Sequence, residues 1–556
     1  MYEPLTDDDL DEEAANRGLA FSVRWALDPL IFGDYPSEMR QYLGNQLPRF
    51  SNDERKFMAN SIDYIAVNHC STAYVKDCIH SSCSSTSNRT ISGFVDEDIE
   101  MMHSLGLKAY RFSISWARIL PRGRFGEVNP AGILFYNKLI DNLILRGIEP
   151  FVTLFHNDIP QELEERYGSW LNPEMKEDFV HMVNRVKYWI TINEPNIVTL
   201  YAYEMGLFPP SRCSEPFGNC VSGNSDVEPL VVMHNMLLAH GMAAKLYRDK
   251  FQHKQGGSIG ITVHSFMFEP LTGSELDRDA VKRAPLDPVI FGDYPEEMLK
   301  YLGSKLPSFL LDEKNLVKNS IDFIGINHYS TIYAKDCTNS SCSPTADRAI
   351  QGFVELVGEQ DGVLIGESTT VDGLYVVPIG MEGIVNHIKI WYNNKPMFIT
   401  ENGYNPSDVQ EEQPVNELVN DIKRYHTSYL AFLAKSIRGA DVRGYFIWSL
   451  MDNYEWLHGY NVRFGLYHVD RKTLARTPKL SAKWYKNFLT NKSDLIDKET
   501  LRDKRFFRKD SLPLALDPLC SGSGEKASGP DQSFGYRVSA PDLDFGHQIL
   551  ASDYNF

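Results

Sequence analysis

The chain has 556 residues, of which 43% are hydrophobic and 23% are charged, and its formal net charge is −18. A chain of this length fits two or three average domains or one large barrel with insertions. Because nucleic-acid binding needs a basic stripe and none is visible, we expect no nucleic-acid partner and favour a neutral small-molecule ligand. No run of residues reaches the ~18 apolar positions that a membrane span needs, so no membrane association is expected.

The amino terminus and the cysteines favour different compartments. The opening MYEPLTDDDLDEE is acidic where a secretory signal is basic and then apolar. Six of the eight cysteines instead stand in close pairs, which are typical of disulfides in an oxidising compartment, with free thiols as the alternative. These pairs are Cys213 with Cys220, Cys337 with Cys342, and Cys78 with Cys83. The compartment therefore stays open.

Three Asn-X-Ser/Thr triplets are candidate glycosylation sites, and they agree with a secretory route to the cell exterior or the vacuole. Such triplets also arise often by chance, so their weight is small. They lie at Asn88, Asn339 and Asn491.

Residues 1–95 duplicate a segment that occurs again at 274–354. DPLIFGDYP at 28–36 matches DPVIFGDYP at 287–295, and SIDYIAVNHC at 61–70 matches SIDFIGINHY, with a constant offset of 259 residues. A solenoid would show many copies at a period of ~20–50 residues, so this is not a solenoid. A duplicated genomic segment or a misjoined gene explains the copy best; the functional alternative is a cap or a replacement strand.

After residue 95 the chain alternates short apolar strands with helical segments, the pattern of βα units around a parallel sheet. Helices are predicted for EDIEMMHSLG and NELVNDIKRYHTSYLAFLAKSI, whose apolar residues recur at three and four positions. A polar residue stands at the end of nearly every strand, as in barrels that carry their chemistry there. We therefore predict an α/β fold, a (β/α)8 TIM barrel over 96–496. The seven predicted strands are AYRFSIS (109–115), PFVTLFH (150–156), KYWITIN (187–193), GSIGITV (257–263), DFIGINHY (322–329), PMFITEN (396–402) and GYFIWSL (444–450).

Two of the strand ends carry a glutamate. Glu194 lies in TINEPN and Glu401 lies in ITENGY. Either glutamate alone would be read as an ordinary surface residue, but two on separate strands supply what glycoside hydrolysis needs. A retaining glycosidase uses one carboxylate as nucleophile and a second carboxyl group as acid and then base.

From about residue 96 to 496 the chain resembles a plant β-glucosidase of glycoside hydrolase family 1. The resemblance rests on YRFSISWARILP, TLFHNDIPQ, TINEPN, CSEPFGNC, FITENGY and WSLMDNYEW followed by RFGLYHVD. It implies a (β/α)8 barrel that hydrolyses O-linked β-D-glucosides with retention, without a cofactor or a metal. Glu194 favours the O-glucosidases over the myrosinases, in which this position is usually Gln.

By matching motif, the resemblance makes Glu401 the nucleophile and Glu194 the acid/base. Arg111 and Tyr329 resemble the partners of the nucleophile, and we expect them to hold Glu401 ionised. Glu194 is expected to stay protonated until it protonates the leaving oxygen.

The resemblance also implies a set of sugar contacts. Asn193 matches the residue that bonds the 2-hydroxyl, and Trp448 matches the aromatic floor under the pyranose. The outer hydroxyls would be held by His156, Glu455 and Trp456. Tyr329 is expected to line the same substrate site.

The family pattern is incomplete in this chain. It normally opens with a first strand and a Gln-bearing motif that bonds the 3- and 4-hydroxyls, and we find no counterpart. SIDYIAVNHC at 61–70 stands there instead and could fill the gap as a strand. Buried hydroxyls without partners cost roughly 1–3 kcal/mol each, so affinity should suffer.

Other departures concern the barrel wall and the tail. The helix before the strand at 187–193 looks short, and Pro285 would break the helix before the strand at 322–329. Residues 497–556 include the Gly/Ser-rich SGSGEKASGPDQS and are expected to be disordered.

The leading hypothesis is a β-glucosidase with impaired activity. The rival is a catalytically inactive carbohydrate-binding or interaction protein on the same scaffold. The sequence leaves the aglycone and the oligomeric state open.

Overall fold

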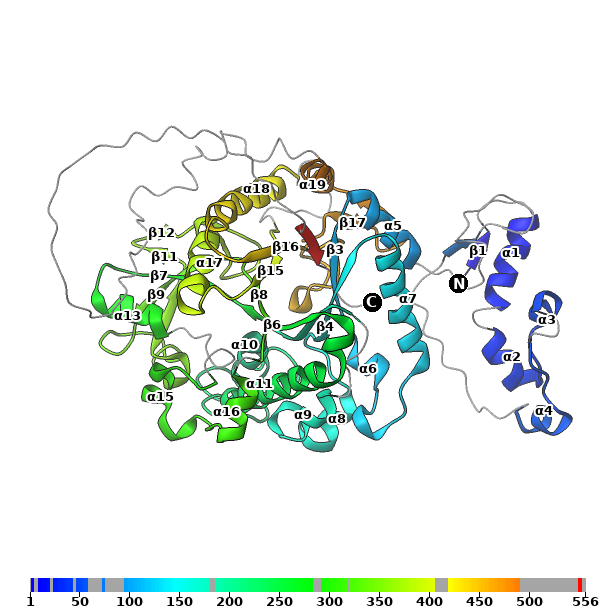
Figure 1. The fold of residues 1–556 in the computed structure, drawn as a ribbon, viewed down its shortest axis with the longest axis horizontal. Helices are drawn as coiled ribbons and strands as arrows, with labels where there is room; N and C mark the ends of the chain where they lie inside the picture. Colours follow the sequence, from blue (N-terminus) through cyan, green and yellow to red (C-terminus); the bar gives the residue numbers. More distant parts are fainter. Residues whose placement is uncertain are drawn as a thin grey trace. The chain divides into compact units, whose positions relative to one another are not determined.

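The computed structural model describes residues 2–4, 9–20, 24–43, 47–58, 73–75, 95–180, 186–283, 292–318, 320–405, 419–490 and 549–552. The chain divides into two compact units. The first comprises Met1–Asp98 and Val469–Arg476, and the second comprises Ile99–His468 and Thr477–Phe556. The second unit contains the barrel (Figure 1).

The first unit contains four short helices and a two-stranded parallel sheet in its described residues. The sheet pairs β1 (Tyr2–Pro4) with β2 (Ala73–Val75). The helices are α1 (Asp9–Leu19), α2 (Trp25–Phe32), α3 (Ser37–Leu43) and α4 (Asn52–Met58), and the next helix, α5 (Val95–Leu105), contains the boundary between the two units. The segment 61–70, expected as a strand, lies outside the described residues.

The two sequence copies share their local structure. At the offset of 259, α3 corresponds to α15 (Glu296–Leu302) and α4 corresponds to α16 (Leu311–Val317), residue for residue. An aromatic pair recurs too, because the rings of Tyr35 and Phe50 lie 4.8 Å apart and those of Tyr294 and Phe309 lie 5.0 Å apart. Over these two helices, the repeated sequence therefore folds in the same way in both places.

The second unit is a closed barrel of parallel strands, in the spatial order β15, β16, β19, β3, β4, β5, β6, β8. The seven predicted strands are all present, so the predicted fold class is confirmed. They are β3 (Ala109–Ser113), β4 (Glu149–Phe155), β5 (Tyr188–Asn193), β6 (Ser258–His264), β8 (Phe323–Asn327), β15 (Met397–Asn402) and β16 (Val442–Trp448).

The eighth strand comes from the end of the chain. Strand β19 (Ile549–Ser552) pairs in parallel with β16 on one side and β3 on the other. In Figure 1 it is the red arrow between β16 and β3. The disorder expected for 497–556 therefore does not hold for these four residues, and the rest of that segment lies outside the described part of the chain.

Aromatic side chains fill the end of the barrel opposite the site. Six strands contribute one buried residue each to this cluster: Ala109, Phe151, Ile190, Phe323, Phe398 and Phe446. The ring of Phe151 lies 5.2 Å from that of Phe398 and 5.0 Å from that of Phe446, both edge-on. Edge-to-face packing at such distances is favourable, so this layer closes the barrel floor.

Helices and small sheets cover the barrel. The larger helices are α7 (Pro130–Leu145), α11 (Glu228–Tyr247), α17 (Ile379–Trp391), α18 (Val419–Ser436) and α19 (Leu480–Thr490). The shorter ones are α6 (Trp116–Ile119), α8 (Gln161–Tyr167), α9 (Met175–Phe179), α10 (Pro195–Val198), α12 (His253–Gln255) and α13 (Glu275–Arg283). The outer strands are β7 (Met267–Pro270), β9 (Thr331–Asp336), β10 (Val354–Val357), β11 (Glu359–Gln360), β12 (Val363–Leu364), β13 (Glu367–Ser368), β14 (Tyr375–Val376), β17 (Tyr467–Val469) and β18 (Arg476–Pro478).

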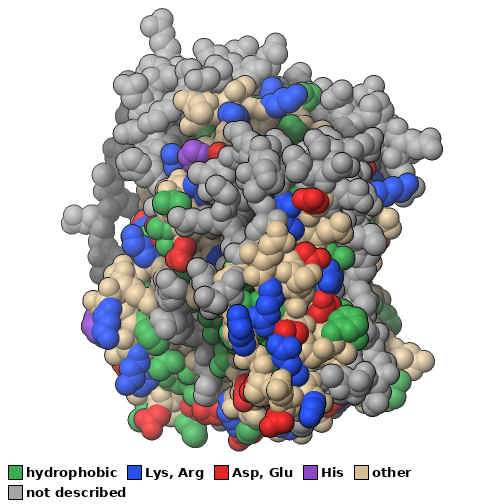
Figure 2. All heavy atoms as spheres, turned by 90° about the vertical axis from the view of Figure 1, so that its right-hand side faces the viewer, with side chains coloured by type: hydrophobic (Ala, Val, Ile, Leu, Met, Phe, Trp, Pro, Cys, Tyr) green, Lys and Arg blue, Asp and Glu red, His purple; other side chains and the backbone are tan. Residues whose placement is uncertain are grey.

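Both expected weak points of the wall adjoin residues that the structure does not describe. Helix α9, which precedes β5, spans Met175–Phe179, and residues 181–185 lie outside the described part of the chain. Helix α13 spans Glu275–Arg283, and Pro285 lies among residues 284–291, which are also outside it, so the helix break at Pro285 stays a prediction. No described helix has the length and hydropathy of a membrane span. On the face drawn in Figure 2, both basic and acidic side chains occur among hydrophobic and other residues.

Candidate active site

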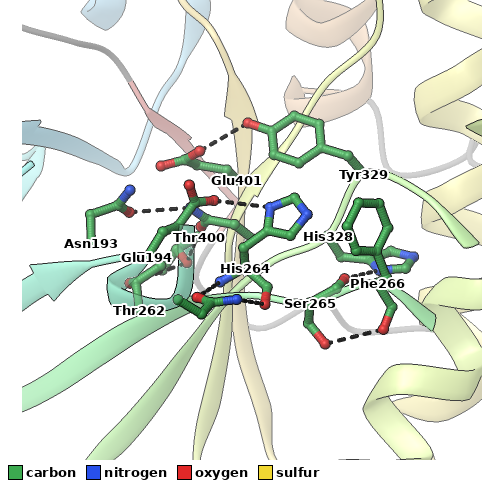
Figure 3. A network of polar contacts seen from close by, with 12 residues as sticks. Asn193, Glu194, Thr262, His264, Ser265, Phe266, His328, Tyr329, Thr400 and Glu401 are labelled. Atoms are coloured by element: carbon green, nitrogen blue, oxygen red, sulfur yellow. Dashed lines mark hydrogen bonds and ion pairs between the residues drawn. The ribbon is translucent and has the colours of Figure 1, made fainter. Parts of the chain in front are cut away.

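The two predicted glutamates lie at the carboxyl ends of barrel strands, where parallel barrels carry their chemistry. Glu194 follows β5 directly and Glu401 lies within β15. Figure 3 shows both side chains pointing toward the same space. The two carboxyl groups are close enough for the charge of Glu194 to raise the pKa of Glu401.

Irregular strand pairing aims these side chains. The register between β5 and β6 shifts between Ile190 and Asn193, and the register between β15 and β8 shifts between Ile399 and Glu401. Strict alternation from the core residue Phe398 would turn Glu401 away from the barrel interior. A bulge re-aims the residue that follows it, so Glu401 faces the site instead.

Glu401 is buried between a cation and a phenol. The Nη1 of Arg111 donates to its Oε1 at 2.5 Å, and the hydroxyl of Tyr329 donates to its Oε2 at 2.9 Å. Arg111 is itself buried and held by Thr153, whose Oγ1 lies 3.2 Å from Nε. Arg111 and Tyr329, the two residues expected beside Glu401, thus contact its two carboxyl oxygens.

Burial changes the pKa of Glu401 more than these two partners do. It raises the pKa of Glu401 to about 7, although Arg111 and the Tyr329 hydroxyl lower it and Glu194 raises it further. The cation and the phenol therefore favour the ionised form of Glu401, as expected, but burial opposes them, because the buried carboxylate loses more hydration than they replace.

Glu194 is held by two residues that the sequence reading did not single out. The Nδ2 of Asn327 donates to Glu194 Oε1 at 2.8 Å, and the Nδ1 of His264 lies 3.2 Å from the same oxygen. Asn327 ends β8 and His264 ends β6, and polar residues at the ends of predicted strands are the one feature of the sequence that could have indicated them. The backbone of Glu194 has φ of +45°, a left-handed conformation that costs about 1–3 kcal/mol for a residue other than glycine and is enriched at functional sites.

Asn193 joins the two halves of the site. Its Oδ1 accepts from Arg111 Nη2 at 2.6 Å and from Asn327 Nδ2 at 3.1 Å. Its Nδ2 lies 2.7 Å from His156 Nε2, which must be the acceptor because the amide nitrogen can only donate. Burial and the charge of Arg111 lower the pKa of His156 well below its usual value, so the ring is neutral.

The expected aromatic contacts lie on the other side of the site. The Nε1 of Trp448 donates to Glu455 Oε1 at 3.0 Å. The ring of His156 lies 6.3 Å from Trp448 and 5.7 Å from Trp456. Burial raises the pKa of Glu455 to about 8, so this side chain is largely protonated at neutral pH. All eight predicted catalytic and substrate-binding residues, together with Arg111, thus lie in connected parts of one barrel end.

The predicted modification sites have mixed outcomes. Cys213 and Cys220 form a disulfide with an S–S distance of 2.06 Å, and Cys337 and Cys342 form another at 2.12 Å. Asn339 is exposed beside the second bridge. Glycosylation at Asn339 stays a prediction. Asn88, Asn491, Cys78 and Cys83 lie outside the described residues.

Comparisons with known proteins agree with this geometry. The model of glycosyl hydrolase family 1 matches residues 1–94 and, separately, residues 91–494. A probable inactive β-glucosidase 14 from Oryza sativa subsp. japonica is 51% identical over 413 residues, which are 71% of this chain and 80% of that protein. The coniferin β-glucosidase of Pinus contorta is 48% identical over 415 residues, with the same two coverages of 71% and 80%.

Solved structures give the same result. The rice Os3BGlu6 β-glucosidase is 43% identical with a TM-score of 0.67, and the match covers 70% of this chain and 86% of that one. A family 1 β-glucosidase from the fungus Humicola insolens, in complex with glucose, is 37% identical with a TM-score of 0.67, over 73% and 88% of the two chains. The family model alone spans well over half of the sequence. This chain therefore belongs to glycosyl hydrolase family 1.

Proposed function

We propose that this protein hydrolyses β-D-glucosides with retention of configuration, with Glu401 as nucleophile and Glu194 as acid/base, and that its activity is impaired. The observation that carries the proposal is the pairing of Glu401 with Arg111 and Tyr329 beside Glu194. A buried carboxylate with a cation on one oxygen and a phenol on the other is oriented for attack on a sugar carbon. No cofactor is needed for this chemistry.

In the first step the ionised Glu401 attacks the anomeric carbon while the bond to the aglycone oxygen breaks. Glu194 gives its proton to that oxygen, so a neutral alcohol leaves. Arg111 neutralises charge on Glu401 before attack, and Asn327 and His264 hold the Glu194 carboxyl group toward the leaving group. The product of this step is a covalent glucosyl ester of Glu401.

In the second step a water molecule loses a proton to Glu194 and displaces Glu401 from the sugar. Because the ester has removed the negative charge of Glu401, Glu194 no longer faces a like charge when it acts as a base. Two inversions at the same carbon restore the β configuration. The protons balance, since Glu194 loses one in the first step and regains one in the second.

The remaining site residues are assigned to glucose binding. Asn193 is fixed by Arg111 and Asn327, which leaves it positioned for the 2-hydroxyl. Trp448 offers an aromatic face, and the largely protonated Glu455 can donate as well as accept a hydrogen bond to the outer hydroxyls. Without the Gln-bearing motif of the family, some sugar hydroxyls lack a partner, so we expect a raised KM.

Azide rescue tests the two roles separately. With an activated aryl β-glucoside, Glu401→Ala should make α-glucosyl azide, because azide enters where the carboxylate attacked. Glu194→Ala should make β-glucosyl azide, because azide replaces the deprotonated water in the second step. Absence of both products from folded variants, with an active wild type, would contradict the assignment.

The alternative is a sugar-binding protein without turnover. It is favoured by the name of the rice relative, a probable inactive β-glucosidase. Calorimetry with glucose separates the two functions. If the protein is a binder, the wild type turns over no aryl glucoside, and Glu401→Ala binds glucose with unchanged affinity. If it is the proposed enzyme, the wild type has measurable turnover, and Glu401→Ala loses it.

A further inference from the structure

The barrel of this protein is closed by the last of the described strands, which lies far along the chain from the other seven. Strand β19 lies between β16 and β3, with Ile549 beside Tyr445 and Ser552 beside both Trp448 and Arg111. The other seven strands come from residues 109 to 448 in chain order. The closing strand therefore follows the other seven strands in this sequence, whereas the first strand of the family pattern precedes them.

The winding of the chain supports this position. Helix α19 follows β16, and its Trp484 stacks on His426 of α18, whose Nδ1 lies 2.9 Å from the Tyr445 hydroxyl of β16. The helix thus packs beside the strand that precedes it. In a βα unit, the strand that follows such a helix commonly returns in parallel beside the strand that precedes it. Strand β19 occupies that position beside β16, although residues 491–548, outside the described part of the chain, separate it from α19.

The gap that β19 fills would be costly to leave open. Every residue of β3 is buried, as are the last five residues of β16, from Gly444 to Trp448. Without β19, both strands would be sheet edges, each with a row of backbone N–H and C=O groups that lack partners. An unpaired buried backbone group costs free energy comparable to a lost hydrogen bond, and an open edge invites aggregation.

The register links β19 to the active site. Its last residue pairs with the residues that carry the guanidinium beside Glu401 and the indole beside Glu455. We propose that Ile549–Ser552 is the closing strand of the barrel and a positioning element of the glucoside site, which sets the spacing between Arg111 on β3 and Trp448 on β16. The strand acts through these two residues.

Hydrogen exchange of the full chain tests the strand without reference to hydrolysis. Amides of Leu550 and Ala551 should exchange at least about tenfold more slowly than the same amides in an isolated peptide of residues 545–556. Leu550→Pro should remove this protection and also speed exchange in β3 and β16. Ser539→Pro, in the same tail but outside the strand, is the matched control and should change neither. Unprotected amides at 549–552 in the full chain would overturn the proposal.

Two truncations separate the strand from the rest of the tail. A chain that ends at Ser552 keeps β19, and a chain that ends at Gln548 lacks it. We expect the shorter chain to lose glucosidase activity by at least about tenfold, because small displacements of site residues have large effects on rate. The peptide 545–556 added in trans should restore both activity and exchange protection of β3 and β16.

Three further outcomes of these experiments bear on the closing strand. Equal exchange of β3 and β16 in both truncated chains would overturn the proposal, whether or not the protein is an enzyme. Protection of residues 61–70 in the shorter chain, with β3 and β16 still protected, would also overturn it in favour of the amino-terminal copy. If the full chain has no glucosidase activity, the exchange results still decide the strand, while the proposed function fails separately.

Discussion

At the residue scale, the charge of Glu401 is set by opposing effects. Burial and the charge of Glu194 raise its pKa, while Arg111 and the Tyr329 hydroxyl lower it, and the balance is about 7. Only the ionised form can attack the sugar. The activity of the free enzyme should therefore fall as the pH falls through this value.

The pH dependence of kcat/KM is the first prediction. With 2,4-dinitrophenyl β-glucoside, whose leaving group needs no acid, the acidic limb should have an apparent pKa near 7. Tyr329→Phe removes a hydrogen bond to the charged form and should move the limb up by about one pH unit. Glu194→Gln removes a like charge and should move it down. Movement of both variants in the same direction would contradict this account.

Asn327 gives a second prediction, because it connects Glu194, Asn193 and Thr400. It donates to Glu194 at 2.8 Å and accepts from Thr400 Oγ1 at 2.7 Å. A hydrogen bond to a charged group contributes about 1.5–3 kcal/mol, so Asn327→Ala should lower kcat/KM by about 10- to 100-fold for an alkyl glucoside. The loss for a dinitrophenyl glucoside should be smaller, since less acid assistance is needed. Equal losses for the two substrates would show that Asn327 does not act through Glu194.

At the scale of single elements, the strands follow from the sequence but their irregularities do not. Seven apolar runs with a polar residue at the carboxyl end predict the strands and the end that carries the site. The register shifts before Asn193 and Glu401 depend on pairing with β6 and β8, which are distant in the chain. The bonds of Asn327 and His264 to Glu194 were missed for this reason, and so was the extent of burial around Glu401.

Strand β19 could not be predicted either. Ile549, Leu550 and Ala551 form a short apolar run that follows a Gly/Ser-rich tail, and a run of this length carries no preference between strand and loop. Its strand conformation comes from the two unpaired edges that it meets.

The aromatic floor of the barrel gives a third prediction. Phe398 is fully packed against rings from three other strands. Phe398→Ala should lower the free energy of unfolding by about 3–5 kcal/mol, because the lost side chain leaves a cavity. Leu145→Ala, at a position that is 80% exposed on α7, is the control and should change it by less than about 0.5 kcal/mol. Urea unfolding measures both, and similar values would refute the packing of this floor.

At the scale of the whole molecule, the chain combines a family 1 barrel with a second copy of one of its own segments. The copy folds locally like the original, as the matching helices and aromatic pairs indicate. The described strands of the barrel and all residues assigned to its site lie outside residues 1–94. Within its described residues, the copy therefore forms a compact unit and contributes no residue assigned to the site.

Removal of the copy is the fourth prediction. A chain that begins at Val95 should keep its glucosidase activity and the thermal unfolding transition of the barrel, because β19 and not the copy closes the barrel. Differential scanning calorimetry and an aryl-glucoside assay of both chains measure this. Loss of activity together with a lowered barrel transition would show that the copy is needed for the barrel.

The central claim is that the two glutamates of this family 1 barrel still form a retaining site. Its most direct test is the intact mass of the folded protein after incubation with 2,4-dinitrophenyl 2-deoxy-2-fluoro-β-glucoside, which traps the glucosyl ester of retaining enzymes. We predict one sugar adduct per chain, and peptide mapping should place it on Glu401. Folded protein that gains no adduct, or gains it on another residue, would contradict the account.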